Sequence, residues 1–371
     1  MIYFDNAATT APFSYIIDHL KDYAEVYGNP SSRHQAGRNA KKVLEKARTT
    51  LANAIHCEPE QLFFTSGGTE SNNIIIDSLC KERFEKKGRI ISTSIEHDSI
   101  LNCLKMRKAE GFDVVLLNVD KNGYVDPKEL EAAITPTTFL ISIQYVNNEI
   151  GTVQNIRKLS EIAHRKGIFF HSDCVQAVGH YPIDVRQLGL DAISSSAHKF
   201  NGIKGTGFLY SNKPILPVIG GGGQEHNVKP GTENLVGIQA MSDALQISLA
   251  DLEEKRQKIF QCVRWLEDAI RQVQGCQLNV DLQGYHSIVN FRCDLLDNEA
   301  LLALLDIKGI CCSAGSACLG NGNSLSHVLR AIKMTDKSIQ HSIRISLSSD
   351  NNLEECKAFI NILKGIVYRN L

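Results

Sequence analysis

Residues 167–179, GIFFHSDCVQAVG, place Ser172 and Asp173 directly after an apolar run. The apolar run follows residues 156–166, whose apolar side chains recur at helical spacing. A continuous apolar strand that follows a helix is typical of a parallel sheet covered by helices on both faces. This segment therefore predicts an α/β fold, with Asp173 at the carboxyl end of a buried strand.

The same alternation of strand and helix extends on both sides of this segment. Further buried strands are predicted at residues 89–95, 113–119, 138–146 and 191–197, with helices at 98–110, 127–133 and 185–188. From about residue 236 the pattern changes to one long helix that ends at about 274, followed by strands at 287–292 and 341–347 and helices at 298–305 and 353–368. The chain thus predicts a large domain with a mostly parallel sheet, joined to a smaller α+β domain.

The composition is that of an ordinary globular protein, with 43% apolar and 22% charged residues. Its 40 basic and 41 acidic residues give a net charge of −1, so no bulk field favours nucleic acid or an anionic membrane. No apolar run approaches the roughly 20 residues that cross a bilayer. The opening sequence MIYFDNAATT lacks the basic and apolar regions of a signal peptide. We expect a cytoplasmic protein without direct nucleic-acid or membrane partners.

Eleven cysteines are spread along the chain. An odd number without an export signal argues against a disulfide framework, and the close cysteines lack the two-residue spacing that zinc sites favour, so no metal is expected. Cys311 and Cys312 are interpreted as strand or strand-end residues of the scaffold, because free cysteines are usually buried. Cys318 differs, since it lies in the polar, glycine-rich run GSACLGNGNS.

Polar residues also follow the other predicted strands. In FTSGGTESNN, residues 64–73, two glycines let backbone amides approach an anion, and Thr69 adds a hydroxyl where a helix begins. An ordinary helix cap is the alternative. Asp173 has the chemistry to hold a proton on a heterocyclic nitrogen, again with a helix cap as the alternative.

Two basic side chains complete this set. Lys199, in SSSAHK, follows a strand and small residues, and lysines in such settings form Schiff bases with carbonyl cofactors. His97 follows another strand, where it could stack on a flat ring or serve as a structural imidazole. An anion cradle, a ring-nitrogen acid, a stacking partner and an imine-forming lysine, each after a strand, match the needs of pyridoxal phosphate.

The chain resembles the cysteine desulfurases, class V members of the aminotransferase-like fold type I enzymes that use pyridoxal phosphate. The motifs that carry the resemblance span nearly the whole chain: YFDNAATT, YGNPSSRHQAGR, FTSGGTESNN, EH, VNNEIGTVQ, HSDCVQAVG, SSSAHK, GTGFLY, GGGQE, GTEN, GSAC, SHVLRA and SIRISL. The resemblance implies a mostly parallel seven-stranded sheet flanked by helices in a large domain, residues 15–250. Residues 1–14 and 251–371 would form the small α+β domain that carries the catalytic cysteine.

The resemblance also implies the roles of individual residues. Those that would hold pyridoxal phosphate are Gly68, Thr69, His97, Asn148, Asp173, Gln176, Ser196, His198, Lys199 and Thr232. Among them, Lys199 would form the Schiff base, Asp173 would bond the pyridine nitrogen and His97 would stack on the ring. Gln176 and Asn148 would lie near the phenolic oxygen, and the remaining residues would bind the phosphate.

Thr232 is similar to a threonine that members of the family lend to the neighbouring subunit, which implies a homodimer with shared active sites. Arg344 and Asn148 would bind the substrate, with the Arg344 guanidinium on its carboxylate. Cys318, as a thiolate, would attack the sulfur of L-cysteine to give a persulfide and L-alanine. Lys199 would shuttle protons, and His97 would act as an acid or base for the thiols.

The segment after Cys318 is long and lacks the compact Arg-Thr-Gly-His-His-Cys type of motif found in the family's other group. It resembles the group with a long loop, whose sulfur goes to a protein acceptor for iron–sulfur cluster assembly or tRNA thiolation. Two regions depart from the family pattern. EHNVKPGT has His226, Lys229 and Pro230 in place of two arginines and a serine, and NSLS replaces the usual Ser-Leu-Glu-Pro-Ser.

Three other functions stay open. A selenocysteine lyase would use the same fold, and so would a class V aminotransferase, although transamination needs no nucleophilic thiol such as that of Cys318. A partner or regulatory protein that retains the fold without catalysis is the third. The intact set of Lys199, Asp173, His97 and Cys318 argues against that reading, because a decayed site would be expected to lose them.

Overall fold

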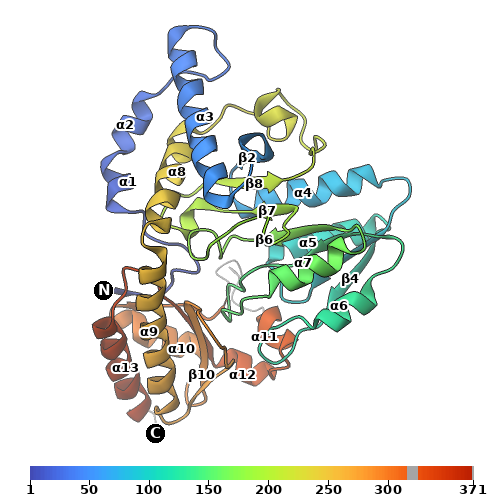
Figure 1. The fold of residues 1–371 in the computed structure, drawn as a ribbon. Helices are drawn as coiled ribbons and strands as arrows, with labels where there is room; N and C mark the ends of the chain where they lie inside the picture. The colour runs from blue at the N-terminus through green and yellow to red at the C-terminus, as the bar shows by residue number, and fades with distance from the viewer. Residues whose placement is uncertain (316–324, 370–371) are drawn as a thin grey trace.

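The computed structural model describes residues 1–315 and 325–369, which form two sheets of unequal size and a short strand pair (Figure 1). The larger sheet has seven strands in the order β2-β8-β7-β6-β5-β3-β4. These are β2 (Leu62–Thr65), β8 (Gly207–Ser211), β7 (Ala192–Ser194), β6 (Phe169–Asp173), β5 (Thr138–Ser142), β3 (Arg89–Thr93) and β4 (Asp113–Leu117). Strand β8 is antiparallel to both neighbours, and every other pair is parallel, which confirms the predicted mostly parallel sheet.

Helices cover both faces of this sheet because its strands are apolar on both sides. Ile90, Leu140 and Phe169 pack with α4 (Gly68–Glu82) and α5 (Asp98–Ala109). Their chain neighbours Ile91 and Ile141 point to the opposite face, which the remaining helices of the large sheet cover. Those helices are α3 (Gln35–Ile55), α6 (Pro127–Ala133), α7 (Ile156–His164) and α8 (Leu235–Leu249). This alternation is what a strand's two-residue period requires.

The smaller sheet is antiparallel in the order β12-β10-β9 and lies at one end of the molecule (Figure 1). Its strands and the helices that build a second core around it are β9 (Cys276–Leu278), β10 (Ile288–Cys293), β12 (Ser342–Ser346), α9 (Leu252–Arg271), α10 (Asn298–Ile307) and α13 (Leu353–Tyr368). Strand β1 (Ile2–Tyr3) pairs in parallel with β11 (Ile310–Cys311), so the first residues of the chain join this part.

The remaining elements are short. They are α1 (Ser14–Asp18), α2 (Leu20–Glu25), α11 (His327–Ala331), α12 (Asp336–Gln340) and the 3-10 turns Pro59–Gln61, Ala197–Lys199 and Gln224–Asn227. Although α11 and α12 follow the second core in sequence, Val328, Leu329 and Ile339 pack into the core of the large sheet. No helix within the described residues is both long and apolar enough to cross a membrane.

Two details differ from the sequence prediction. The predicted long helix, residues 236–274, is interrupted between α8 and α9, because Ala250 is extended and Asp251 adopts a left-handed conformation with φ of 53°. The predicted helix at 185–188 is a turn. There the Asp184 carboxylate caps the amides of Arg186 and Gln187, but Gly189 adopts a left-handed conformation with φ of 64°, which ends the helical turn.

Candidate active site

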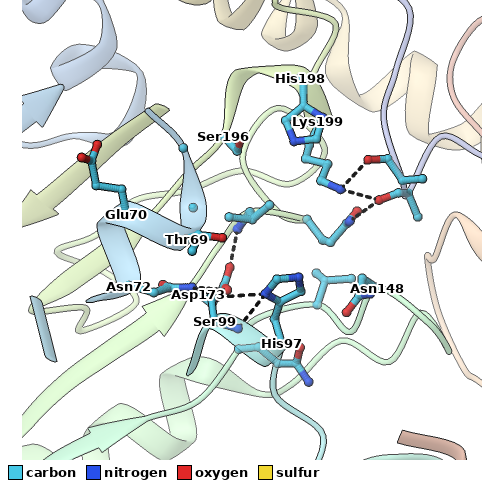
Figure 2. Close-up of a pocket in the computed structure, with 18 of the residues that line it drawn as sticks. Thr69, Glu70, Asn72, His97, Ser99, Asn148, Asp173, Ser196, His198 and Lys199 are labelled. Atoms are coloured by element: carbon cyan, nitrogen blue, oxygen red, sulfur yellow. Dashed lines mark hydrogen bonds between the residues drawn. The ribbon is translucent and has the colours of Figure 1, made fainter. Parts of the chain in front are cut away.

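A cavity of about 410 Å³ lies where the parallel strands end. All strands of the large sheet except β8 run in the same direction, so the polar residues that follow them meet at one edge. The predicted residues that line this cavity are Gly68, Thr69, His97, Asn148, Asp173, Gln176, Ser196, His198, Lys199 and Arg344. Figure 2 shows most of these side chains converging on the cavity from different elements.

One wall of the cavity is the start of α4. Gly67 precedes the helix with φ of 147°, a conformation that favours glycine, and its position carries no side-chain cap for the helix. A Cβ on Gly68 would lie 2.4 Å from Val175 Cγ2, so only glycine fits here without displacement. The first amides of α4 therefore lack a side-chain cap and lie beside Ser196, which also lines the cavity. This is an arrangement that binds phosphate groups.

His198 and Lys204 also line the cavity. Burial and, to a smaller degree, the neighbouring positive charges of Lys199 and Lys204 together lower the pKa of His198 to about 4. His198 is therefore neutral at pH 7 and shares a hydrogen bond of 3.1 Å with Thr9 Oγ1 through Nδ1. A neutral imidazole can still donate one hydrogen bond to an anion.

Asp173 is the last residue of β6 and is buried at 8% exposure. Its Oδ1 accepts a hydrogen bond from the Val175 amide at 2.9 Å, and its Oδ2 accepts one from Asn72 Nδ2 at 2.8 Å. The hydrogen bond from the Val175 amide is the kind that a capping aspartate accepts, so Asp173 also has the local structural role considered from the sequence. The carboxylate also lines the cavity, so the structural and the ligand-binding interpretations hold together.

Lys199 reaches the cavity from the 3-10 turn after β7. Its Nζ donates hydrogen bonds to the carbonyl oxygens of Ala7 and Ala8, at 2.7 and 2.8 Å. Gln176 Nε2 donates to the same Ala7 carbonyl at 2.8 Å. The motif NAATT near the start of the chain thus supplies backbone acceptors that hold the lysine in the cavity.

His97 projects into the cavity just before α5, beside Asp173 and Asn148 (Figure 2). Its Nδ1 lies 2.8 Å from Ser99 Oγ and accepts a hydrogen bond from the Ser99 amide at 3.1 Å. His97 is therefore the N-cap of α5, and the structural role considered for a lone histidine is real. The ring is nevertheless part of the cavity wall, where a planar ligand would meet it.

Arg344 approaches from β12 in the smaller sheet and is only 1% exposed. Its Nη1 donates to the carbonyl oxygen of Asn148 at 2.9 Å, and its Nη2 donates to Asp5 Oδ1 at 2.7 Å. Its Nε has no hydrogen-bond partner among the described residues. A buried guanidinium with an unused N–H at a cavity wall suits a small carboxylate.

The predicted residue Thr232 lies elsewhere. Its side chain is exposed, and it is not among the described residues that line the cavity of its own chain. Lys229, one of the departures from the family pattern, lies 4.0 Å from Glu70, a residue of the cavity wall. The predicted nucleophile Cys318 lies outside the described residues. Cys311 is the last residue of β11. Burial, together with smaller contributions from Asp5 and Cys311, raises the pKa of Cys312 to about 12.

Several cavity residues were not predicted, namely Ala7, Ala8, Glu70, Asn72, Ser99, Gln144 and Lys204. Asn72 and Glu70 lie within the predicted anion-binding motif, and Asn72 comes three residues after Thr69, a helical spacing that could have found it. The carbonyl groups of Ala7 and Ala8 carry no side-chain signal. Within the described residues, no three His, Cys, Asp or Glu side chains gather as they would around a metal ion.

Comparison with known proteins connects this cavity to a family. The chain matches the aminotransferase class-V family over residues 2–359. The cysteine desulfurase IscS of Methanosarcina thermophila is 38% identical over 372 aligned positions, which cover 99% of this chain and 92% of that protein. A solved NifS-like protein superposes with a TM-score of 0.93, at 34% identity and 99% coverage of both chains.

A further solved structure, SspA in complex with cysteine, matches with a TM-score of 0.83 and 32% identity, covering 94% of this chain and 99% of that one. Enzymes of this family depend on pyridoxal phosphate. The similarity extends over nearly the full length and includes every motif region listed from the sequence. The chain therefore belongs to the class-V aminotransferase family and, within it, to the cysteine desulfurases.

Proposed function

We propose that this protein is a pyridoxal phosphate-dependent cysteine desulfurase that converts L-cysteine to L-alanine and receives the sulfur on Cys318. The observation that carries the proposal is the convergence of Lys199, Asp173, His97 and the uncapped start of α4 on one cavity, with Arg344 at its wall. Each of these groups has the chemistry to bind one part of the cofactor or of an amino-acid substrate.

The residues that line the cavity have the chemistry to hold pyridoxal phosphate. Gly67 and Gly68 leave room for a phosphate at the α4 amides, where Thr69, Ser196 and neutral His198 add donors. Asp173 presents a carboxylate already oriented by two hydrogen bonds, and it would hold a proton on the ring nitrogen. Gln176 and Asn148 would contact the ring oxygen. When bound, the cofactor supplies an electron sink for the bonds at the substrate Cα.

Three residues of the chain act on the substrate. Arg344 orients its carboxylate, which fixes the Cα and Cβ positions relative to the other groups. Lys199 Nζ would take up and deliver protons near Cα. The Cys318 thiolate attacks the substrate sulfur, so that an S–S bond forms as the C–S bond breaks. The step needs no external oxidant, because the electrons lost by the substrate sulfur are gained by Cβ, which becomes the methyl group of alanine.

We also propose a homodimer in which Thr232 completes the phosphate site of the neighbouring subunit. Its exposed position away from its own cavity supports this assignment. The persulfide would pass to a protein acceptor that serves iron–sulfur cluster assembly or tRNA thiolation, in the cytoplasm. The many free cysteines of the chain suit a reducing compartment.

The proposal is tested by incubating the protein, loaded with pyridoxal phosphate, with L-cysteine. Alanine should form in step with sulfur transfer, and mass spectrometry should place the persulfide on Cys318. The variant Cys318→Ala should keep the absorbance of the bound cofactor and lose sulfide release. Absence of alanine would overturn the proposed activity, and a persulfide on Cys311 or Cys312 would overturn the assignment of the nucleophile. A large preference for selenocysteine would instead support the lyase.

A further inference from the structure

Asn72 is a fully buried residue of the cavity wall to which the proposed reaction assigns no role. Its Nδ2 donates one hydrogen bond to Asp173 Oδ2 at 2.8 Å and another to Ser99 Oγ at 2.9 Å. Rotating the amide would place its oxygen against the Asp173 carboxylate, so this orientation is the favourable one. Both hydrogens of the amide are therefore used, and both bonds have a fixed direction.

The direction of these bonds determines the proton of the Ser99 hydroxyl. Ser99 Oγ accepts from Asn72, which leaves its own hydrogen to donate, and His97 Nδ1 lies 2.8 Å away. The Ser99 amide donates to the same nitrogen at 3.1 Å. His97 Nδ1 is thus an acceptor, and in a neutral imidazole the hydrogen must then be on Nε2.

We propose that Ser99, with its hydroxyl oriented by Asn72, is a positioning residue that holds His97 in the tautomer with the hydrogen on Nε2. In this form Nε2 has no lone pair with which to take a proton from a thiol. In the proposed reaction, His97 Nε2–H then donates a hydrogen bond to a thiolate sulfur. Of the two roles expected from the sequence, acid or base for the thiols, this tautomer excludes the base. The assignment of this task rests on the proposed function, whereas the tautomer rests on geometry alone.

The tautomer is measured directly on the protein carrying its cofactor, labelled with ¹⁵N-histidine. Long-range ¹H–¹⁵N correlation distinguishes a protonated from an unprotonated ring nitrogen, and His97→Gln identifies the His97 signals. We expect a protonated Nε2 and an unprotonated Nδ1. A hydrogen on Nδ1 of His97 would by itself overturn the proposal. No turnover is needed, so failure of the desulfurase reaction is a separate result.

Two variants then test the role of Ser99. Ser99→Ala removes the hydroxyl and keeps the amide, so the preference for the hydrogen on Nε2 should weaken but persist. Ser99→Pro removes both donors at a position in the first turn of α5, where proline is tolerated. It should give mixed His97 tautomers and lower kcat about tenfold, the equivalent of one hydrogen bond of ~1.4 kcal/mol, with KM changed less than about twofold.

The matched control is Lys128→Pro. Its amide donates at 2.8 Å to the capping carboxylate of Asp126, at the same position in the exposed helix α6. This control variant should leave the His97 signals and kcat unchanged. If Ser99→Pro behaves like Lys128→Pro in both measurements, Ser99 does not position His97.

Discussion

Arg344 at the cavity wall is buried and forms an ion pair with the half-buried Asp5, although 338 residues separate them in sequence: Nη2 of the arginine donates to Oδ1 of the aspartate at 2.7 Å. The pair connects the start of the chain to β12 of the smaller sheet. Because Arg344 is almost completely buried, Asp5 supplies a negative charge that offsets the charge of the guanidinium.

The first prediction concerns this charge. Asp5→Asn keeps a hydrogen-bond acceptor for Arg344 and removes the carboxylate charge, so a substrate carboxylate becomes the principal counter-charge. We expect KM for L-cysteine to fall about fivefold, or ~1 kcal/mol, and the substrate-free protein to lose stability. Steady-state kinetics and urea unfolding measure the two effects. The control Asp336→Asn breaks the exposed pair with Arg330 and should change neither quantity. A rise in KM would show that Asp5 serves chiefly to orient the guanidinium.

The second prediction concerns the buried pair of Arg48 and Glu225. The two side chains are joined by bonds of 2.8 and 2.7 Å, and Glu225 also accepts from the Phe64 amide at 2.7 Å. Glu225 adopts a left-handed conformation with φ of 46°, which these bonds stabilise. Arg48→Met leaves the carboxylate buried without its partner and should cost about 3–5 kcal/mol in urea unfolding.

The exposed pair Arg157–Glu161 provides the comparison for Arg48→Met. Arg157→Met should change the free energy of unfolding by less than about 0.5 kcal/mol, because exposed ion pairs contribute little. Equal effects of the two substitutions would contradict the importance of burial at Arg48.

The third prediction is a pH dependence caused by Glu96. Burial, opposed by hydrogen bonds from Thr93 and Gln144 and aided by the charge of Asp173, raises the pKa of Glu96 from 4.5 to about 8. Between these values the folded chain retains a proton that the unfolded chain has lost, so stability falls as the pH rises. Wild type should therefore lose stability relative to Glu96→Gln between pH 4.5 and about 8.

Chemical unfolding at a series of pH values measures this difference between wild type and Glu96→Gln. The exposed Glu85 is the control, and Glu85→Gln should keep a constant offset from wild type over the same range. A gap between wild type and Glu96→Gln that stays constant with pH would show that Glu96 has the same charge in the folded and unfolded chains.

The fourth prediction concerns the contact between β8 and the turn before α4, where we propose that phosphate binds. A Cβ on Gly207 would lie 2.4 Å from the Ser195 carbonyl oxygen and 2.7 Å from Gly67 Cα. Gly207→Ala should therefore displace the turn and weaken binding of pyridoxal phosphate about tenfold, measured by equilibrium dialysis. Gly365→Ala, inside α13 with nothing within 4 Å, should leave cofactor affinity unchanged and stabilise the chain by about 0.5–1 kcal/mol. Unaltered affinity in Gly207→Ala would contradict the role of this contact.

The sequence alone predicted the α/β class and the strand-by-strand order of polar motifs, and together with the family resemblance it predicted ten of the residues that line the cavity. It could do so because apolar runs specify buried strands, and residues that follow parallel strands meet at one edge of the sheet whatever the details of packing. The position of Asp173 after its strand and of Lys199 after the next were predictable in this way. The domain limits at residues 14 and 250, and the role of Cys318, stay predictions.

Tertiary structure decided the contacts between groups far apart in the chain. The Ala7 and Ala8 carbonyl groups that hold Lys199 have no side-chain signature, because every residue carries a carbonyl. The pairing of Asp5 with Arg344 depends on β1 and β12 approaching the same cavity, which no local pattern encodes. The break at Asp251 depends on one left-handed residue within a continuous helical pattern. These features arise from packing between segments, and only the folded chain determines which segments meet.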